Sequence, residues 1–504
     1  MEGFSAWRSR LEQRVLAPMA ATSRRSYAWL ALLLVVLAWG VYAYVLEVQN
    51  GLIVTGMRDR ISWGLYIANF VFFIGISHVG MLLSAILRVT RARWQMSITR
   101  MAELITIAAL FVAALFPLID LGRPDRILNI VLYGRWQSPL LWDIFAISTY
   151  FTGSMIYLYL LLIPDFALCR DQLGPTAPAW KRAFFNLTAL GWKGSAEQHH
   201  ALQRAVTIMM IVIIPVAISV HTVVSWIFAM TLRSPFNSTV FGVFFVAGAI
   251  YSGIAAVILL MAALRKLLHF EEYITQKHFV YLGYLLATLA LIMGYLNLTE
   301  YITTGYKMEE GIWFYIQQLT VGPFAPLFWF NIFGGIFIPG LIILYSRTRN
   351  IQGIIVASVL VLIGMWIERY LIVVGGFRVP LMSYAAADYF PTWVEWSILA
   401  GAFALFAFLI SLFVKFIPVI SVWEVVEQRE YELKSEPQTA APALQGAPAL
   451  ASAAEPGASR PSVWRRASAR LTRREALRSM GLFGAVHSHN RAAFAGRRHG
   501  QGPM

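Results

Sequence analysis

Apolar stretches of about 20 residues recur along the chain, separated by short segments rich in Gly, Pro and charged residues. An α-helix rises about 1.5 Å per residue, so about 20 apolar residues cross a hydrocarbon core of about 30 Å. Stretches of this length lie at 28–48, 62–88, 98–120, 139–163, 204–231, 240–268, 276–304, 323–346, 351–374 and 393–418. The pattern predicts an all-α polytopic membrane protein with about ten transmembrane helices. An even number of spans places both ends of the membrane domain on one side.

The pattern also divides the chain into three parts: an N-terminal arm at 1–27, a membrane domain at 28–424 and a basic tail at 425–504 that is expected to be disordered. The segment PLLWDIF at 139–145 opens the fourth span, and PLFWFNIF at 326–333 opens the eighth. This similarity predicts two four-helix bundles in parallel repeat, at about 62–231 and 240–374. The spans at 28–48 and 393–418 are then peripheral.

Composition supports a membrane protein, because the chain is 58% hydrophobic and 13% charged, against about 45–50% and about 25% in soluble domains. The single cysteine, Cys169, excludes a disulfide framework and any iron–sulfur cluster held by this chain alone.

The net charge of +15 follows the positive-inside rule more closely than it suggests nucleic acid. Loops on the side of the termini carry nineteen Lys and Arg residues, and the opposite loops carry eight. Both termini are therefore predicted to be cytoplasmic. The opposite loops at 49–61, 121–138, 305–322 and 375–392 are rich in Gly, Pro, Trp and Tyr, which favours a docking surface.

Ionisable residues inside spans cost roughly 2.5–3.5 kcal/mol each on insertion, so they are candidates for function. They are His78, Glu103, Asp120, Asp143, His221, Glu300, Glu368, Arg369 and Glu395. Asp120 and Asp143 both fall at the outer ends of their spans and are expected to share one site. Arg123 is expected to hold one of these carboxylates or a polar headgroup; the alternative is an interfacial Asp–Arg pair that fixes a loop.

Two intramembrane histidines raise the possibility of a haem with two His ligands. Counting residues from the outer ends places His78 roughly 9 Å deeper than His221, which disfavours a shared haem. Each His is then a proton relay or a hydrogen-bonded packing residue. Glu368 and Arg369 are adjacent, so each is expected to face a different partner; a structural ion pair with other spans is the alternative. The sequence contains no Walker loop, dinucleotide fingerprint, HExxH or nucleophile elbow.

Several motifs occur in one order: WG at 63–64, GISHVG at 75–80, DLGRP at 120–124, SPLLWD at 138–143 and SVHTVVS at 219–225. With these motifs the chain resembles the NrfD/polysulfide-reductase membrane-subunit family. Within that family it is most similar to the ten-span NrfD-like quinol-binding subunit of bacterial alternative complex III.

The resemblance implies a location in the bacterial cytoplasmic (inner) membrane and no haem or iron–sulfur cluster in this chain. It implies menaquinone or ubiquinone chemistry near the outer face. Implied partners are a periplasmic iron–sulfur/molybdopterin-like subunit, multihaem c-type cytochrome subunits and a second NrfD-like membrane subunit. Asp120 stands where those relatives commonly have His, and Ile227 stands where they have a second Asp. At these two positions, the residues expected to accept protons from the quinol therefore differ from the family pattern.

The leading hypothesis is a quinol-oxidising membrane subunit in which Asp143 accepts a proton together with Asp120 or His221. Arg123, Trp142 and Ser225 complete the expected headgroup site. The expected proton path consists of His78, Glu103, Glu300, Glu368, Arg369 and Glu395. The alternatives are a quinone-reducing subunit of a polysulfide-reductase-type molybdoenzyme, a secondary transporter with broken helices at the midplane, and a structural anchor for an iron–sulfur protein.

Overall fold

The computed structural model describes residues 2–20, 23–89, 98–175, 177–231, 233–380 and 388–435. Ten helices among them are long and apolar enough to cross a membrane, and no extended strand occurs in these ranges. The predicted all-α fold with ten spans is therefore confirmed.

The spanning helices are α2 (Arg24–Asn50), α3 (Leu65–Val89), α4 (Thr99–Asp120), α6 (Pro139–Gln172), α8 (Ala196–Ala229), α9 (Phe241–Leu267), α10 (Gln276–Lys307), α12 (Ala325–Trp329) continued by η5 (Phe330–Phe337) and α13 (Ile338–Leu344), α14 (Ile351–Tyr370) continued by η6 (Leu371–Gly375) and α15 (Gly376–Arg378), and α16 (Trp393–Phe416). The shorter helices are α1 (Glu2–Ala20), α5 (Asn129–Leu132), α7 (Ala179–Thr188), α11 (Glu310–Thr320) and α17 (Val422–Ser435). Single turns of 3-10 helix lie at η1 (Leu52–Val54), η3 (Pro124–Arg126) and η4 (Ser234–Phe236).

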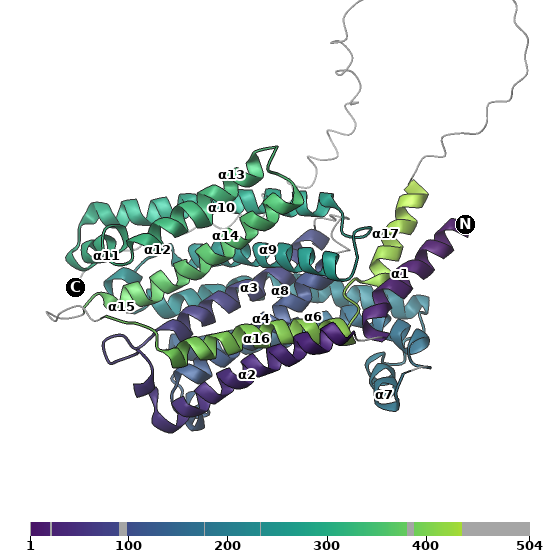
Figure 1. Cartoon of the computed structure of the whole chain (residues 1–504), viewed down its shortest axis with the longest axis horizontal. Helices are drawn as coiled ribbons and strands as arrows, with labels where there is room; N and C mark the ends of the chain where they lie inside the picture. Colours follow the sequence, from purple (N-terminus) through teal and green to yellow (C-terminus); the bar gives the residue numbers. More distant parts are fainter. Residues whose placement is uncertain are drawn as a thin grey trace, which may run out of the picture. The chain divides into compact units, whose positions relative to one another are not determined.

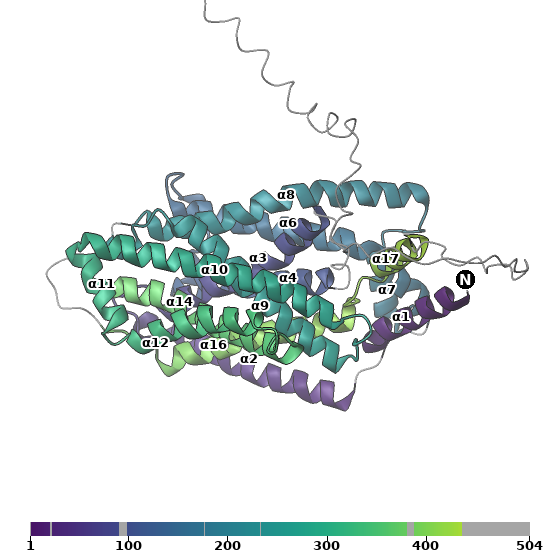
Figure 2. The same cartoon turned by 90° about the horizontal axis from the view of Figure 1, so that it is seen from above.

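The helices pack as two rings of four (Figures 1 and 2). In the first ring α3 contacts α4, α4 contacts α6, α6 contacts α8, and α8 returns to α3. In the second ring α9, α10, the α12–α13 segment and α14 follow one another in the same order. The rings join where α3 packs on α9 and α14, and α8 packs on α9. Helices α2 and α16 pair with each other outside the rings and contact α4 through α16.

The second ring contains two π-helical segments, η5 and η6, in which the backbone stays helical. Comparison of PLLWDIF at 139–145 with PLFWFNIF at 326–333 shows one extra residue in the second copy, beside Phe330. An inserted residue within a helix is accommodated as a π-helical turn. The π-helical segment η5 begins at Phe330 and accounts for this insertion, which brings the buried Asn331 into correspondence with Asp143.

The two ends of the helix array differ. The end that carries α1, α7 and α17 is here called the terminal end, and the end that carries residues 51–64, 121–138, 308–324 and 388–392 is called the loop end (Figure 1). The predicted tail at 425–504 is corrected in its first part, because residues up to Ser435 belong to α17. The rest of that tail, 436–504, lies outside the described residues.

Helices α3 and α4 approach each other closely at Gly80. A Cβ atom on Gly80 would lie 1.8 Å from the carbonyl oxygen of Ala102 and 2.2 Å from the hydroxyl of Thr106. On the same helix, a Cβ atom on Gly75 would lie 3.6 Å from its nearest neighbour, the hydroxyl of Ser252, which is ordinary van der Waals contact. The close packing of α3 on α4 therefore requires glycine at position 80 but not at position 75.

Substituting Gly80→Ala is therefore expected to destabilise the protein by about 1–3 kcal/mol, because α3 and α4 must move apart. Gly75→Ala is the matched control and is expected to be neutral or slightly stabilising, since Ala is a better helix former than Gly. Thermal unfolding in detergent compares the two variants. Equal stability of the two variants would contradict this packing.

Candidate functional site

Charged and polar side chains are buried at three levels of the membrane domain: a network at the terminal end, a central cluster where the two rings meet, and a group of carboxyl side chains at the loop end. Burying such groups is costly unless they are paired. The partners of each group therefore distinguish structural residues from candidate functional ones.

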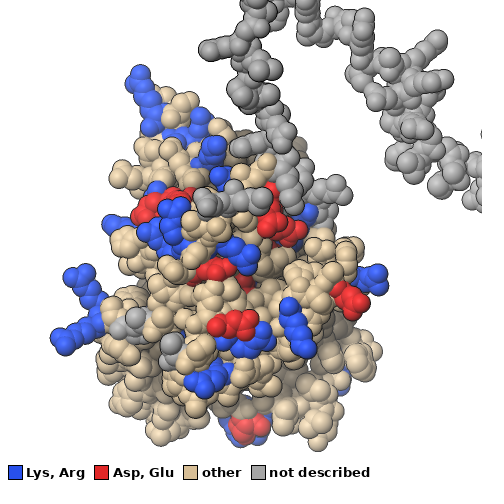
Figure 3. Space-filling model, turned by 90° about the vertical axis from the view of Figure 1, so that its right-hand side faces the viewer, with Lys and Arg blue, Asp and Glu red and all other residues tan. Residues whose placement is uncertain are grey.

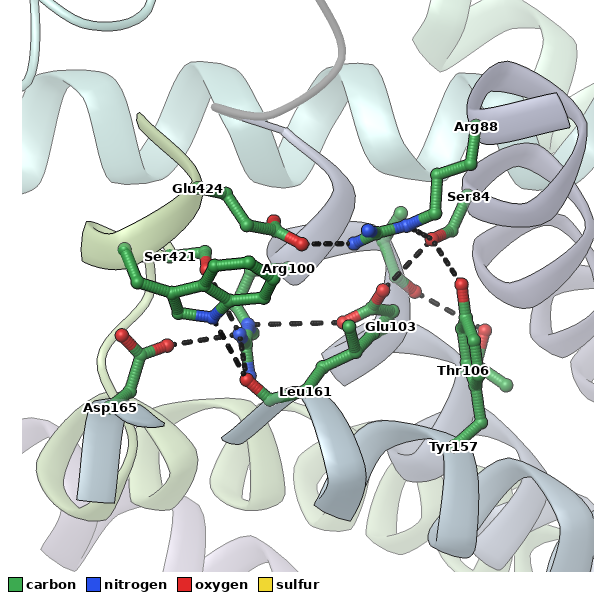
Figure 4. A network of polar contacts seen from close by, with 12 residues as sticks. Ser84, Arg88, Arg100, Glu103, Thr106, Tyr157, Leu161, Asp165, Ser421 and Glu424 are labelled. Atoms are coloured by element: carbon green, nitrogen blue, oxygen red, sulfur yellow. Dashed lines mark hydrogen bonds and ion pairs between the residues drawn. The ribbon is translucent and has the colours of Figure 1, made fainter. Parts of the chain in front are cut away.

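Arg100 is the centre of the terminal-end network (Figure 4). It lies in the first turn of α4 and is only 1% exposed. Its Nη2 donates to Asp165 Oδ2 at 3.0 Å, to the Leu161 carbonyl at 2.9 Å and to Ser421 Oγ at 3.2 Å. Its Nε lies 3.8 Å from Glu103 Oε2. Arg100 therefore ties α4 to α6 and to the segment that follows α16.

Glu103 extends this network toward the interior. Its Oε1 accepts a hydrogen bond from Ser84 Oγ at 2.9 Å, and Ser84 Oγ lies 3.3 Å from the Tyr157 hydroxyl. Nearby, Arg88 pairs with Glu424 at 2.5 Å (Figure 4). The network thus connects α3, α4, α6 and α17 through alternating donors and acceptors.

The sequence interpretation missed most of this network. Arg88 and Arg100 are among the nineteen basic residues assigned to loops, although Arg88 ends the predicted span at 62–88 and Arg100 falls within the one at 98–120. Asp165 lies just beyond the predicted end of its span, because α6 runs on to Gln172. One sequence signal could have revealed this network: an arginine and a carboxylate, Arg100 and Asp165, lie close to the ends of two consecutive spans.

The central cluster contains the two histidines in direct contact. The ring centroids of His78 and His221 lie 4.3 Å apart, and the Tyr150 ring stacks on His78 at 4.7 Å. The expected depth difference between the histidines is therefore wrong. It assumed that both spans end at one level on the outer side, whereas the contact between the rings shows that the start of α3 and the end of α8 lie at different depths. Rings in contact leave no space for an iron ion between them, so the geometry opposes a shared haem.

Hydrogen bonds at the two histidines leave ring nitrogens for other partners. The Nδ1 of His78 bonds the Ile74 carbonyl at 2.5 Å, and the Tyr150 hydroxyl donates to the Ser77 carbonyl at 3.0 Å. Among the described residues, both ring nitrogens of His221 have no hydrogen-bond partner. These nitrogens are available to exchange protons.

Glu368 and Arg369 pair with each other at 3.4 Å, Oε2 to Nη1. This corrects the expectation that these adjacent residues face different partners, because both long side chains bend toward one another beside η6. Asn297 lies 3.4 Å from Glu368 Oε1, and Arg369 lies 4.8 Å from the Phe245 ring. The Arg369 guanidinium fits against Gly248, where a Cβ atom would lie 2.3 Å from Nη2.

Asp143 lies in the second turn of α6 at the loop end and is only 6% exposed. Among the described residues, its Oδ1 has no hydrogen-bond partner. The neighbouring Trp142 donates to the Trp136 carbonyl at 2.5 Å, which fixes the loop before α6. Ser225 is buried on α8, one turn from His221, and donates to the Thr222 carbonyl at 2.6 Å.

Asp120 faces a different part of the molecule from Asp143. Its charged neighbours are Glu47 of α2 and Glu395 of α16, and Asp143 is not among them. The expected shared site of Asp120 and Asp143 is therefore corrected. Both residues lie at the loop end, but α4 turns Asp120 toward the peripheral helices.

Arg123 does not hold either carboxylate. It makes two hydrogen bonds of 3.1 Å to Asp125, two residues along an exposed turn. The Arg123 guanidinium lowers the pKa of the Asp125 carboxyl through these hydrogen bonds. Of the two readings of Arg123, the structure favours the one in which it fixes a loop, with Asp125 as the partner.

Glu395 and Glu300 each have local partners. Glu395 accepts from Thr392 N at 2.9 Å and Gly56 N at 2.7 Å, so it caps α16 and anchors the loop between α2 and α3. Tyr389 also donates to Glu395, and burial beside this carboxylate raises the pKa of the Tyr389 hydroxyl. Glu300 accepts from Ser238 at 2.7 Å.

Glu300 also lines a small pocket of the second ring, together with Asn297, Tyr301, Tyr315 and Phe244. This pocket lies on the α10 side of the Glu368–Arg369 pair, since Asn297 contacts both.

One buried carboxyl group was missed although it lies inside a predicted span. Glu47 of α2 is fully buried and accepts a hydrogen bond of 2.5 Å from the Tyr66 hydroxyl. Across the described ranges, no three His, Cys, Asp or Glu side chains converge as metal ligands.

Comparison with known proteins places this fold in a family. Residues 53–380 match the family model described as Polysulphide reductase, NrfD. A protein of Halobacterium salinarum that is named as a dimethyl sulfoxide reductase membrane subunit is 27% identical over 412 residues, covering 78% of this chain and 91% of the relative.

Two further relatives are named for quinone chemistry. The Hdr-like menaquinol oxidoreductase integral membrane subunit of Archaeoglobus fulgidus is 26% identical over 423 residues, covering 80% of this chain and 96% of the relative. The menaquinone reductase integral membrane subunit of Nitratidesulfovibrio vulgaris is 22% identical over 418 residues, covering 78% and 91%. Because the family match covers more than half of a chain with ten candidate spans, this protein is a multi-pass integral membrane member of the NrfD polysulphide reductase family.

Proposed function

We propose that this chain is the quinol-binding membrane subunit of a multi-subunit oxidoreductase and that it oxidises quinol at the loop end. The observation that carries the proposal is the buried Asp143 with an unpartnered carboxyl oxygen. Two relatives named for menaquinol or menaquinone support the substrate class. Oxidation of one quinol releases two protons and two electrons and leaves the quinone.

Asp143 accepts the first hydroxyl proton in this proposal. A buried carboxylate without a competing partner is a suitable base, because a quinol hydroxyl supplies the hydrogen bond that the protein does not. His221 is the second acceptor, since it lies on the adjacent helix α8 and both of its ring nitrogens lack partners among the described residues. Asp120 Oδ1 also lacks a hydrogen-bond partner among the described residues, but Asp120 is less suited, because Glu47 and Glu395 are its charged neighbours.

The electrons leave to a partner docked at the loop end. Large apolar side chains are exposed there, although soluble surfaces rarely gather them. They include Leu128, Leu132, Tyr133, Trp136, Tyr306, Val321 and Phe390. Such a surface suits a redox subunit of the iron–sulfur/molybdopterin-like type, which in an assembly resembling alternative complex III is accompanied by multihaem c-type cytochromes and a second NrfD-like subunit.

Both termini are placed on the cytoplasmic side in this proposal. The terminal end projects many Lys and Arg side chains (Figure 3), and the bias of basic residues toward this side follows the positive-inside rule. The loop end, with Asp143, then faces the outer side of a bacterial cytoplasmic membrane.

Quinol oxidation is coupled to proton translocation in this proposal, along a path that takes up protons at the terminal end and runs between the two ends. It starts at Asp165 and Glu103 in the terminal-end network and reaches Tyr157 through Ser84. Tyr157 and Tyr150 share the buried face of α6, and Tyr150 stacks on His78. A branch through His221, Arg369, Glu368 and Asn297 leads to the pocket of Glu300.

The second candidate function is the reverse reaction, quinone reduction in a polysulfide-reductase-type complex. It is favoured by the relative named as a menaquinone reductase subunit. A secondary transporter is less suited, because the spans of the described residues are interrupted only by π-helical segments that stay helical. A purely structural anchor gives no reason for the unpartnered carboxyl oxygen of Asp143.

Replacing Asp143→Asn in the assembled complex is expected to lower the rate of quinol oxidation about a hundredfold or more, because an amide does not accept the proton. Stopped-flow oxidation of a water-soluble quinol analogue by the complex measures this rate. The matched control is Asp125→Asn on the exposed turn at the same end, which is expected to leave the rate unchanged. An unchanged rate in Asp143→Asn would refute the assignment.

Replacing Glu103→Gln is expected to abolish most proton uptake from the terminal side while quinol oxidation continues, because the path is interrupted away from the substrate. Proton uptake is measured with a pH-sensitive dye inside vesicles that contain the complex. Asp171→Asn, an exposed carboxylate at the same end, is the control. Normal uptake in Glu103→Gln would show that protons do not follow this path.

A further inference from the structure

Two lysines at the terminal end, on α7 and α16, approach each other beside the end of α1. Lys181 of α7 donates from Nζ to the Met19 carbonyl at 2.5 Å, and Lys415 of α16 donates from Nζ to the Pro18 carbonyl at 2.9 Å. Because Pro18 and Met19 are consecutive residues near the end of α1, the two ammonium groups are neighbours. Each lies within electrostatic range of the other.

The carbonyl oxygens of Pro18 and Met19 orient the ammonium groups but carry no full negative charge. The last carbonyls of a helix carry a partial negative charge, and lysines commonly bind there. Two positive charges side by side still repel each other, and both side chains are only half-buried. Burial lowers the pKa of Lys181, which is the direction expected when a cation is partly withdrawn from water. An anion between the two groups would relieve this repulsion.

The position of the pair matches the headgroup level of a bilayer. Lys415 is the residue before the last of α16, a helix of 24 residues, and it therefore lies at one membrane interface. Beside it the Trp180 ring lies 6.0 Å from the Phe416 ring and is 60% exposed. Tryptophan is enriched at membrane interfaces, where its amphipathic ring sits between tails and headgroups.

Helix α7 has the form of a helix lying in that interface. Its Phe185 is fully buried against the protein, whereas Trp180 and Leu187 are exposed. Figures 1 and 2 show α7 at the terminal end, outside both rings. An exposed apolar face together with basic residues is the pattern of helices that bind anionic membrane surfaces.

Helix α2 contributes more positive charge at the same level. Trp29 donates to Ser411 at 3.1 Å, which fixes the register of the antiparallel pair α2 and α16. Arg25 lies one turn before Trp29, and Lys415 lies one turn after Ser411, so both residues lie at the same height on facing helices.

We propose that Lys181 and Lys415 form a binding site for the headgroup of an anionic phospholipid of the cytoplasmic leaflet, bordered by Trp180 and Arg25. The phosphate lies between the two ammonium groups, and the acyl chains follow the exposed surface of α2 and α16. This site is independent of the quinol site, because it lies at the opposite end of the spans.

The test uses the full chain, purified in detergent and titrated with dioleoyl phosphatidylglycerol or dioleoyl phosphatidylcholine, with bound lipid counted by native mass spectrometry. In Lys181→Gln/Lys415→Gln, the tightest phosphatidylglycerol is expected to bind about thirtyfold more weakly. That change corresponds to about 2 kcal/mol, at about 1.4 kcal/mol per tenfold. Binding of phosphatidylcholine is expected to stay the same.

Two further variants separate charge from structure. Lys181→Arg/Lys415→Arg keeps both charges and is expected to retain phosphatidylglycerol. Lys266→Gln/Lys277→Gln removes two charges from the same end at the second ring and is also expected to retain it. Unchanged binding in the first double variant, or equal loss in the control, would overturn the proposal. Displacement of the lipid by millimolar inorganic phosphate would also overturn it, by showing a simple anion site.

Discussion

The structure depends on one constraint: a charged or polar group withdrawn from water costs free energy unless another group in the protein pairs with it. Arg100 shows how the constraint is met. It is almost completely buried, yet it bonds Asp165, the Leu161 carbonyl and Ser421. Two of these bonds reach α6 and the third reaches the segment after α16, so pairing one arginine also holds α4, α6 and that segment together.

The same constraint separates structural carboxylates from candidate functional ones. Glu395 has its oxygens bonded by Tyr389, Thr392 and the Gly56 amide, and its role is to hold a loop against a helix. Asp143 is buried as well, but one of its oxygens has no partner among the described residues. Other carboxylates, such as Asp120 and Glu368, also have a buried oxygen without a hydrogen-bond partner, but each has a charged neighbour. Asp143 has an unpartnered oxygen and no ion pair among the described residues, and this combination is the physical basis for assigning substrate chemistry to it. The contact between His78 and His221 provides a second candidate site for proton transfer.

Much of the fold follows from the sequence, because bilayer thickness imposes a length on each span. All ten predicted spans are present, although α6 runs on well past its predicted end and α8 begins well before its predicted start. The site was harder to predict. Counting residues along one helix gives the depth of a residue below the end of that helix, but it does not give the level at which the neighbouring helices end. This is why the contact between His78 and His221 was missed, and why Asp120 turned out to face Glu47 in place of Asp143.

The central claim is that the quinol headgroup meets Asp143 at the loop end. An electron cryomicroscopy structure of the assembled complex with a bound quinol analogue tests it most directly. The account predicts an oxygen of the headgroup about 2.6–3.0 Å from Asp143 Oδ1, as in a short hydrogen bond. A headgroup bound elsewhere, for example in the pocket of Glu300 and Asn297, with Asp143 left without contact, would contradict it.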